Sequence, residues 1–243
     1  MDIFKCILFL LSDLQIQANL NFELVLLADS DCNQIYSEMN TEDWWWDTQD
    51  HILAGATIVP VICASDKTPM TNLLGNQHTW PPYLTIGEIR KDICWTPTRH
   101  AWMLVRHIPC PPKGAKNIDE AWYNAVGTVL SQLRHLCITG AGLKWDGADG
   151  LQGQCYPLLA AWVEDYPAQV MVAQVSYGSC PMCQIPEGGP MWHSAFQPHN
   201  NSRDRHIYPE LLEDITVDPL HTLSVRPIRN QLGRYALCNV YQL

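Results

Sequence analysis

The chain has 243 residues, of which 47% are apolar and 16% are charged, so it can build a packed core and is not wholly disordered. Its formal net charge of −10 provides no general attraction for nucleic acid, although this charge does not exclude DNA binding. The ten cysteines are scattered along the chain, which argues against a small disulfide-stabilised scaffold.

The N-terminal apolar run, Cys6–Leu11, ends at Ser12 and Asp13. This run is too short for a membrane-spanning helix, and it lacks the longer apolar stretch and cleavage site of a signal peptide. We expect a buried helix or strand here, with a weak signal peptide as the alternative, and no membrane association. Phe22–Leu27 predicts a second strand or helix.

Three adjacent tryptophans, Trp44–Trp46, cannot all face the same side of a strand. At least one of them should therefore reach a second surface, a cap or a partner. The same three residues, together with Trp80, Trp95 and Trp102, could stack on nucleic-acid bases. Packing in the core is the more frequent role of tryptophan.

The middle of the chain predicts a mixed fold. Residues 57–64 form a β-branched run typical of a buried strand, and residues 81–89 and 101–108 predict two further strands. Residues 118–139 have apolar side chains at three- and four-residue steps, which predicts a helix, and the apolar run 156–163 predicts another strand. This order is that of an RNase H-like fold, although the pattern supports α/β and α+β equally.

The composition changes after this core. Residues 187–221 are rich in Pro, Asn, His and Asp, which predicts an irregular insertion or linker. We divide the chain into an N-terminal flanking segment (1–43), a core (44–179), a Cys/His-containing insertion (180–222) and a C-terminal segment (223–243).

Two acidic residues, Asp66 and Asp165, each follow a predicted strand. Carboxylates at strand ends can share one cleft and bind Mg²⁺ or Mn²⁺, which activates water for phosphodiester cleavage. The alternative is that each Asp caps a turn or the next helix. Lys67 and Thr68 could contact phosphate, or form a solvated turn. Glu164 should face away from Asp165, because neighbouring residues on a strand point in opposite directions.

Cys180 and Cys183 form a CxxC pair, the spacing of half a tetrahedral zinc site. A redox pair and two buried thiols are the alternatives. The sequence contains no second CxxC pair, so the other zinc ligands would be isolated cysteines or histidines; the candidate histidines are His193, His199, His206 and His221.

Several long strings together resemble one known family. They are WWWDTQDHILAGATIVPVICASDKTPMTNLLGNQHTWPPYLTIGEIRKDI, ADGLQGQCYPLLAAWVEDYPAQ, CPMC and VRPIRN. In this order they are similar to the Plavaka-type transposases, which are fungal relatives of the CACTA group of cut-and-paste DNA transposases. The similarity extends from about residue 35 to residue 185 and resumes near residue 223.

The resemblance implies an RNase H-like catalytic core with three acidic residues and a divalent metal, Mg²⁺ or Mn²⁺. Asp66 corresponds to the first acidic residue and Asp165 to the second, with Asp149 as the rival for the second role. Cys180 and Cys183 correspond to a cysteine pair of the family, which implies a Zn²⁺-stabilised insertion. The resemblance further implies transposon-end DNA as partner, a nuclear location and a homo-oligomer as one possible state.

The chain also departs from the family pattern. Glu88 occupies a position where we expect Asn, and the strings CWTPT and LQGQC replace more basic ones. Family members continue past the VRPIRN-like segment to a third acidic residue, whereas this chain ends at Leu243. We therefore expect a truncated remnant of a DNA strand-transfer enzyme with little or no cleavage activity. The alternative is a non-catalytic, zinc-binding interaction domain that retains the fold.

Overall fold

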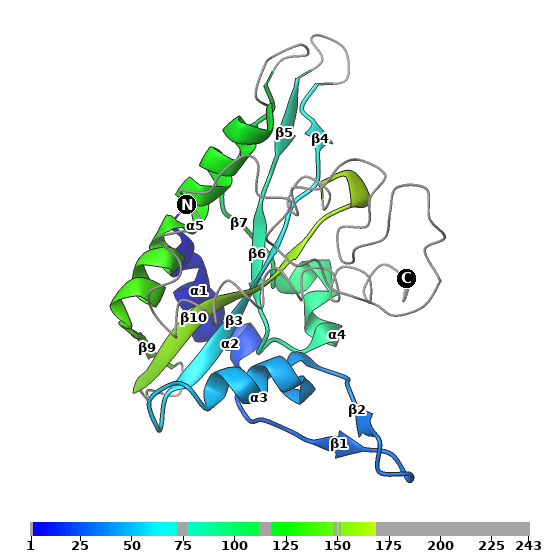
Figure 1. Ribbon diagram of the computed structural model, residues 1–243, viewed down its shortest axis with the longest axis vertical. Coiled ribbons are helices and arrows are strands. Elements are labelled where there is room, and N and C mark those ends of the chain that lie inside the picture. Colours follow the sequence, from blue (N-terminus) through cyan, green and yellow to red (C-terminus); the bar gives the residue numbers. More distant parts are fainter. Residues whose placement is uncertain (1, 72–76, 112–117, 148–149, 151, 169–243) are drawn as a thin grey trace, which may run out of the picture.

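The computed structural model describes residues 2–71, 77–111, 118–147, 150 and 152–168. Its main sheet has five strands in the order β7-β6-β3-β10-β9 (Figure 1). β3 and β10 are parallel, and the other neighbouring strands are antiparallel. The bounds of these strands are β3 Thr57–Ala64, β6 Tyr83–Ile86, β7 Met103–Leu104, β9 Leu143–Asp146 and β10 Gln152–Val163.

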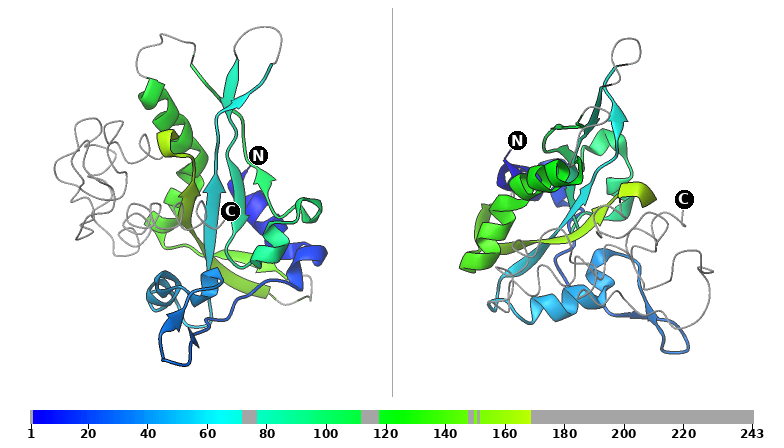
Figure 2. Two further views of the ribbon diagram at one scale, coloured as in Figure 1. Left: turned by 90° about the vertical axis from the view of Figure 1, so that its right-hand side faces the viewer. Right: turned by 45° about the horizontal axis from the view of Figure 1, so that its top comes forward.

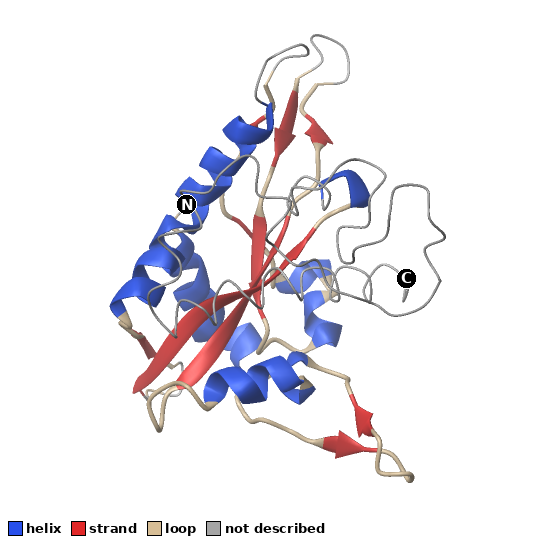
Figure 3. Cartoon of the chain, viewed as in Figure 1, coloured by secondary structure: helices blue, strands red, loops and turns tan. Residues whose placement is uncertain are grey.

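Helices flank this sheet, and shorter strands form two small additional sheets (Figure 3). The helices are α1 Ile3–Ser12, α2 Leu14–Gln17, α3 Asp43–Gln49, α4 Lys91–Cys94 and α5 Ile118–Thr139, with 3₁₀ turns η1 Met39–Thr41 and η2 Pro97–Arg99. The short strands are β1 Leu27–Ala28, β2 Gln34–Ile35, β4 Thr68–Pro69, β5 His78–Trp80 and β8 Ile108–Pro109. The predicted mixed sheet with flanking helices is therefore confirmed.

One face of the sheet is covered by α1 and α5. Val59, Val61 and Cys63 alternate along β3, as residues on one face of a strand must, and pack in the same buried cluster as both helices. The N-terminal apolar run is thus a buried helix, one of the two predicted forms. Asp2 caps this helix by accepting a hydrogen bond from the Phe4 N–H.

The opposite face is covered by α3. Trp44 and Trp45 pack there against Ile58 of β3 and Leu158 of β10. The three tryptophans lie on a helix rather than a strand, and Trp46 is 37% exposed. The three indoles therefore do not all face the same side, since Trp44 and Trp45 are buried and Trp46 is partly exposed. The right-hand view of Figure 2 shows α1 and α5 on one side of β3 and β10, and α3 and α4 on the other.

The predicted strand 57–64 and the predicted helix 118–139 coincide with β3 and α5. The region 101–108 contains the short strand β7, and β8 begins at its last residue. The structure has no strand or helix at residues 22–26; β1 begins at Leu27 and pairs with β2 in a hairpin that projects from the body (Figure 1). No helix within the described ranges combines the length and hydropathy needed to cross a bilayer.

Candidate functional site

The parallel pairing of β3 with β10 brings two of the predicted site residues together. Ala64 pairs with Val163 at the ends of these strands, and the Ser65 N–H donates to the Val163 carbonyl oxygen at 3.1 Å. Asp66 and Asp165 each lie two residues beyond this last pair. Because β3 and β10 are parallel neighbours paired in this register, both aspartates lie at the same end of adjacent strands.

Strand alternation explains which face each carboxylate occupies. Ser65 and Glu164 are 5% and 4% exposed, one residue beyond the strand ends. Asp66 and Asp165 come next and are both exposed. They therefore continue the row of residues that faces α3 and α4, while Glu164 is buried towards the α1–α5 side, opposite to Asp165 as the sequence predicts.

Asp165 also has a local structural role. Residues 166–168 are helical, and the Ala168 N–H donates to Oδ1 of Asp165 at 3.1 Å. This is the geometry of an N-cap, which was the alternative interpretation of the residue. The cap uses one of the two carboxylate oxygens and orients the side chain at the end of β10.

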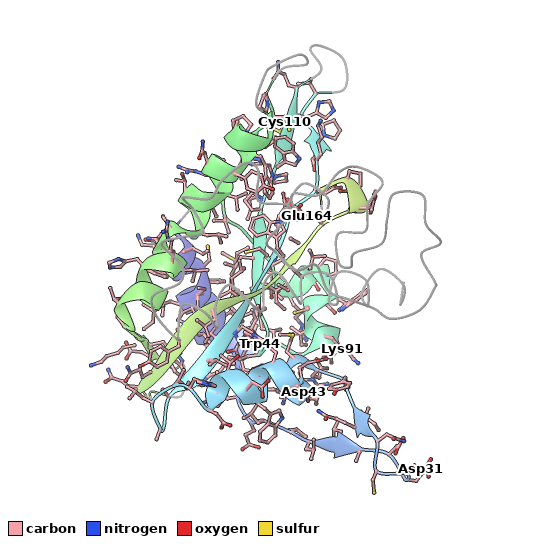
Figure 4. All side chains as sticks on the ribbon, in the orientation of Figure 1. Asp31, Asp43, Trp44, Lys91, Cys110 and Glu164 are labelled. Atoms are coloured by element: carbon pink, nitrogen blue, oxygen red, sulfur yellow. The ribbon has the colours of Figure 1, made fainter. Side chains whose placement is uncertain are left out.

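Glu164 is a third acidic group at this sheet end (Figure 4). Its Oε1 accepts a hydrogen bond from Nε1 of Trp162, whose ring makes an edge contact with Trp122 of α5 at 6.1 Å between centroids. Burial, reinforced by the charges of Asp165 and Asp66, raises the pKa of the Glu164 carboxyl to about 8. The carboxyl is thus mostly protonated at neutral pH, which limits the negative charge beside the two aspartates.

The residues after Asp66 begin the small sheet. The Thr68 hydroxyl donates to the Asp66 carbonyl oxygen at 3.1 Å, which fixes the turn. Nζ of Lys67 lies 5.6 Å from the centroid of the Trp80 ring, a cation–π contact that holds the ammonium group near the acidic end.

Comparison with known proteins supplies the family. The family model of the Plavaka transposases matches residues 1–232. The chain belongs to the Plavaka transposase family. No curated protein matches the chain, and no solved structure does. The Plavaka match includes the N-terminal residues 1–34, which carry none of the similar strings quoted above, and it implies that the protein binds DNA.

Other residues that the Plavaka resemblance singles out lie outside the described residues. They are Asp149, Cys180 and Cys183, together with the four candidate histidines. Within the described ranges, no three His, Cys, Asp or Glu side chains are grouped in a way that would hold a metal ion. The role of Glu164 as a buried neighbour of both aspartates was missed, although its position one residue before Asp165 was visible in the sequence.

Proposed function

We propose that this chain contains the core of a metal-dependent enzyme for DNA strand cleavage and transfer, with Asp66 and Asp165 as metal ligands. The observation that carries the proposal is the parallel register of β3 and β10, which ends two residues before both aspartates. The sheet supports an RNase H-like interpretation: the three antiparallel neighbours β3, β6 and β7 are followed along the chain by α5, by the short strand β9 and then by β10, which is parallel to β3.

The chemistry follows from the types of residue present. Exposed carboxylate oxygens suit Mg²⁺ or Mn²⁺, and a bound ion of this kind would supply Lewis-acid activation of water or of a 3′ hydroxyl. Asp66 and the Asp165 oxygen that the cap does not use would hold it. Lys67, fixed near Trp80, is placed to pair with a phosphate of the bound strand.

The described part of the chain offers two exposed carboxylates at this end, fewer than a tight divalent site uses. We therefore expect these two aspartates by themselves to bind the metal weakly and to support little or no strand cleavage. Family membership also supports a nuclear location, where the DNA substrate lies.

The test is titration with Mn²⁺ and an Mg²⁺-dependent plasmid-nicking assay on the wild-type chain and on Asp66→Asn and Asp165→Asn variants. Each variant should lower Mn²⁺ affinity about tenfold and abolish any residual nicking, because each removes a charged ligand. Asp47→Asn is the matched control, since Asp47 is an exposed aspartate on α3. Equal Mn²⁺ affinity in all four proteins would refute the metal site.

A second candidate function is a non-catalytic, zinc-binding interaction domain, which the CxxC pair Cys180 and Cys183 favours. We expect one tightly held Zn²⁺ per chain in elemental analysis of purified protein. A Cys180→Ser/Cys183→Ser double variant should lose the metal, whereas Cys32→Ser, at an exposed thiol of the β1–β2 hairpin, should retain it. Wild-type protein without zinc would remove this candidate.

A further inference from the structure

Trp95 is the most exposed of the tryptophans singled out in the sequence. Its side chain is 59% exposed, whereas Trp44, Trp45 and Trp80 are at most 7% exposed. Large indoles are usually buried, and an exposed one offers a flat apolar surface at little entropic cost. The exposure of Trp95 is therefore unusual for a tryptophan side chain.

Basic residues flank Trp95 in the sequence. Lys91 and Trp95 are four residues apart in the turn that α4 forms, so their side chains lie on the same side. Arg99 is exposed in η2, which packs against α4. Arg90 is also present, but its guanidinium is paired with Asp92 at 2.9 Å. We call residues 90–100 the Trp95 knob.

Hydrogen bonds within the knob fix its shape. The backbone N–H of Trp95 donates to the Lys91 carbonyl oxygen at 3.0 Å, and the Thr96 hydroxyl donates to the Asp92 carbonyl oxygen at 2.8 Å. Oε2 of Glu38 accepts a hydrogen bond from the Lys91 N–H at 3.1 Å. The indole is thus presented on a preorganised support, which lowers the entropic cost of binding a flat ligand.

The knob lies on the same face of the sheet as the two aspartates. Sγ of Cys94 lies 3.7 Å from Oγ1 of Thr85 in β6, and Thr85 pairs with Ile62 in β3. Ile62 and Asp66 are four residues apart and share a face, at a separation of roughly 13 Å along the strand. Cys94, the neighbour of Trp95, therefore lies beside β6 on this face, roughly 13 Å along the strand direction from Asp66.

The charge distribution limits where DNA can lie. Residues 6–66 contain ten Asp and Glu and no Lys or Arg, so this segment carries a formal charge equal to that of the whole chain. Residues 90–107 contain four Lys and Arg and one acidic residue, Asp92. Apart from Glu38, which lies at Lys91, the first segment carries its negative charge outside the knob, so phosphates are repelled by the first segment and attracted by the second.

We propose that the Trp95 knob binds single-stranded DNA beside the candidate metal site, with a base stacked on Trp95 and phosphates paired with Lys91 and Arg99. This inference rests on the proposed function, because the knob would be the surface that holds an unpaired DNA strand near Asp66. Single strands are favoured over duplex because a base in a duplex cannot stack on a protruding indole, whereas an unpaired base can.

The test is fluorescence anisotropy of a labelled oligo-dT of about 20 nucleotides with the full chain in EDTA. Trp95→Ala should weaken binding about tenfold, Trp95→Phe should restore most of it, and Lys91→Glu/Arg99→Glu should weaken binding and flatten its salt dependence. Trp46→Ala is the matched control, since Trp46 is a partly exposed indole in the acidic segment and should bind as wild type does.

Equal affinity of Trp95→Ala and wild type, or an equal loss in Trp46→Ala, would overturn the proposal. Binding of duplex in preference to oligo-dT would also overturn it. The Mn²⁺ titration of the wild-type chain separates this proposal from the proposed function. A failed titration with intact Trp95-dependent binding of oligo-dT rejects the catalytic site alone, and Mn²⁺ binding without Trp95-dependent binding of oligo-dT rejects the knob alone.

Discussion

Trp45→Ala should lower the free energy of unfolding by about 3–5 kcal/mol, the largest stability loss that we expect from a single substitution. Trp45 is fully buried and lies in the cluster that joins α3 to β3 and β10. No acceptor for its Nε1 lies among the described residues, so the loss comes from packing and not from a broken hydrogen bond. The helix that carries Trp45 covers the aspartate-bearing face of the sheet.

Urea denaturation followed by circular dichroism measures this effect. Trp45→Phe should lower the free energy of unfolding much less than Trp45→Ala does, because it keeps an aromatic ring in the cavity and removes an N–H that has no acceptor in the described structure. Trp46→Ala, at the neighbouring exposed indole, should change stability by less than about 1 kcal/mol. Similar losses for Trp45→Ala and Trp46→Ala would contradict the packing seen on this face.

Glu88→Gln should remove a large pH dependence of stability. Glu88 is fully buried, neither of its carboxyl oxygens has a hydrogen-bond partner in the described structure, and burial raises the pKa of the carboxyl well above its ordinary range. The folded state therefore holds this proton more tightly than the unfolded state. Stability is then highest below the ordinary glutamate pKa and falls as pH rises towards the raised value.

The measurement is the denaturation midpoint at pH 5 and at pH 8. Wild-type stability should fall over this range by roughly 1–3 kcal/mol more than that of Glu88→Gln, whose side chain carries no proton to lose. Glu23→Gln is the control, because Glu23 is exposed and should leave the wild-type slope unchanged. If the stability of the wild type and of Glu88→Gln changed equally with pH, ionisation of Glu88 would have no effect on the free energy of unfolding, which would contradict the prediction. The buried acid occupies the position where the family pattern led us to expect Asn.

The sequence predicted the longer helices and strands, because their formation depends on patterns among residues that are close together in the chain. The β-branched run 57–64 and the periodic run 118–139 became β3 and α5 with the expected bounds. The short strands β2, β4 and β5 were not foreseen, since their two or three residues carry no period of their own. β1 and β8 each begin at the last residue of a predicted segment, 22–27 and 101–108. Their pairing depends on contacts between distant segments.

The candidate site, like the fold, was predicted only in part from the sequence. The positions of Asp66 and Asp165 after strands were readable, because each follows an apolar run. Their adjacency was not, since it depends on the parallel register of β3 with β10 and on a shift in that register between Leu159 and Ala161. A one-residue change in that register would place the two side chains on opposite faces.

The pairing of β3 with β10 also has a consequence for biosynthesis. These central strands are separated by the whole of β4–β9 and α5, so the contact between them closes a long loop. A nascent chain that has emerged from the ribosome only as far as α5 has one of the two aspartates and no neighbouring strand to bring the other beside it. The adjacency of the two aspartates at this end of the sheet is therefore acquired only after β10 has been synthesised, and a polypeptide interrupted before β10 lacks it.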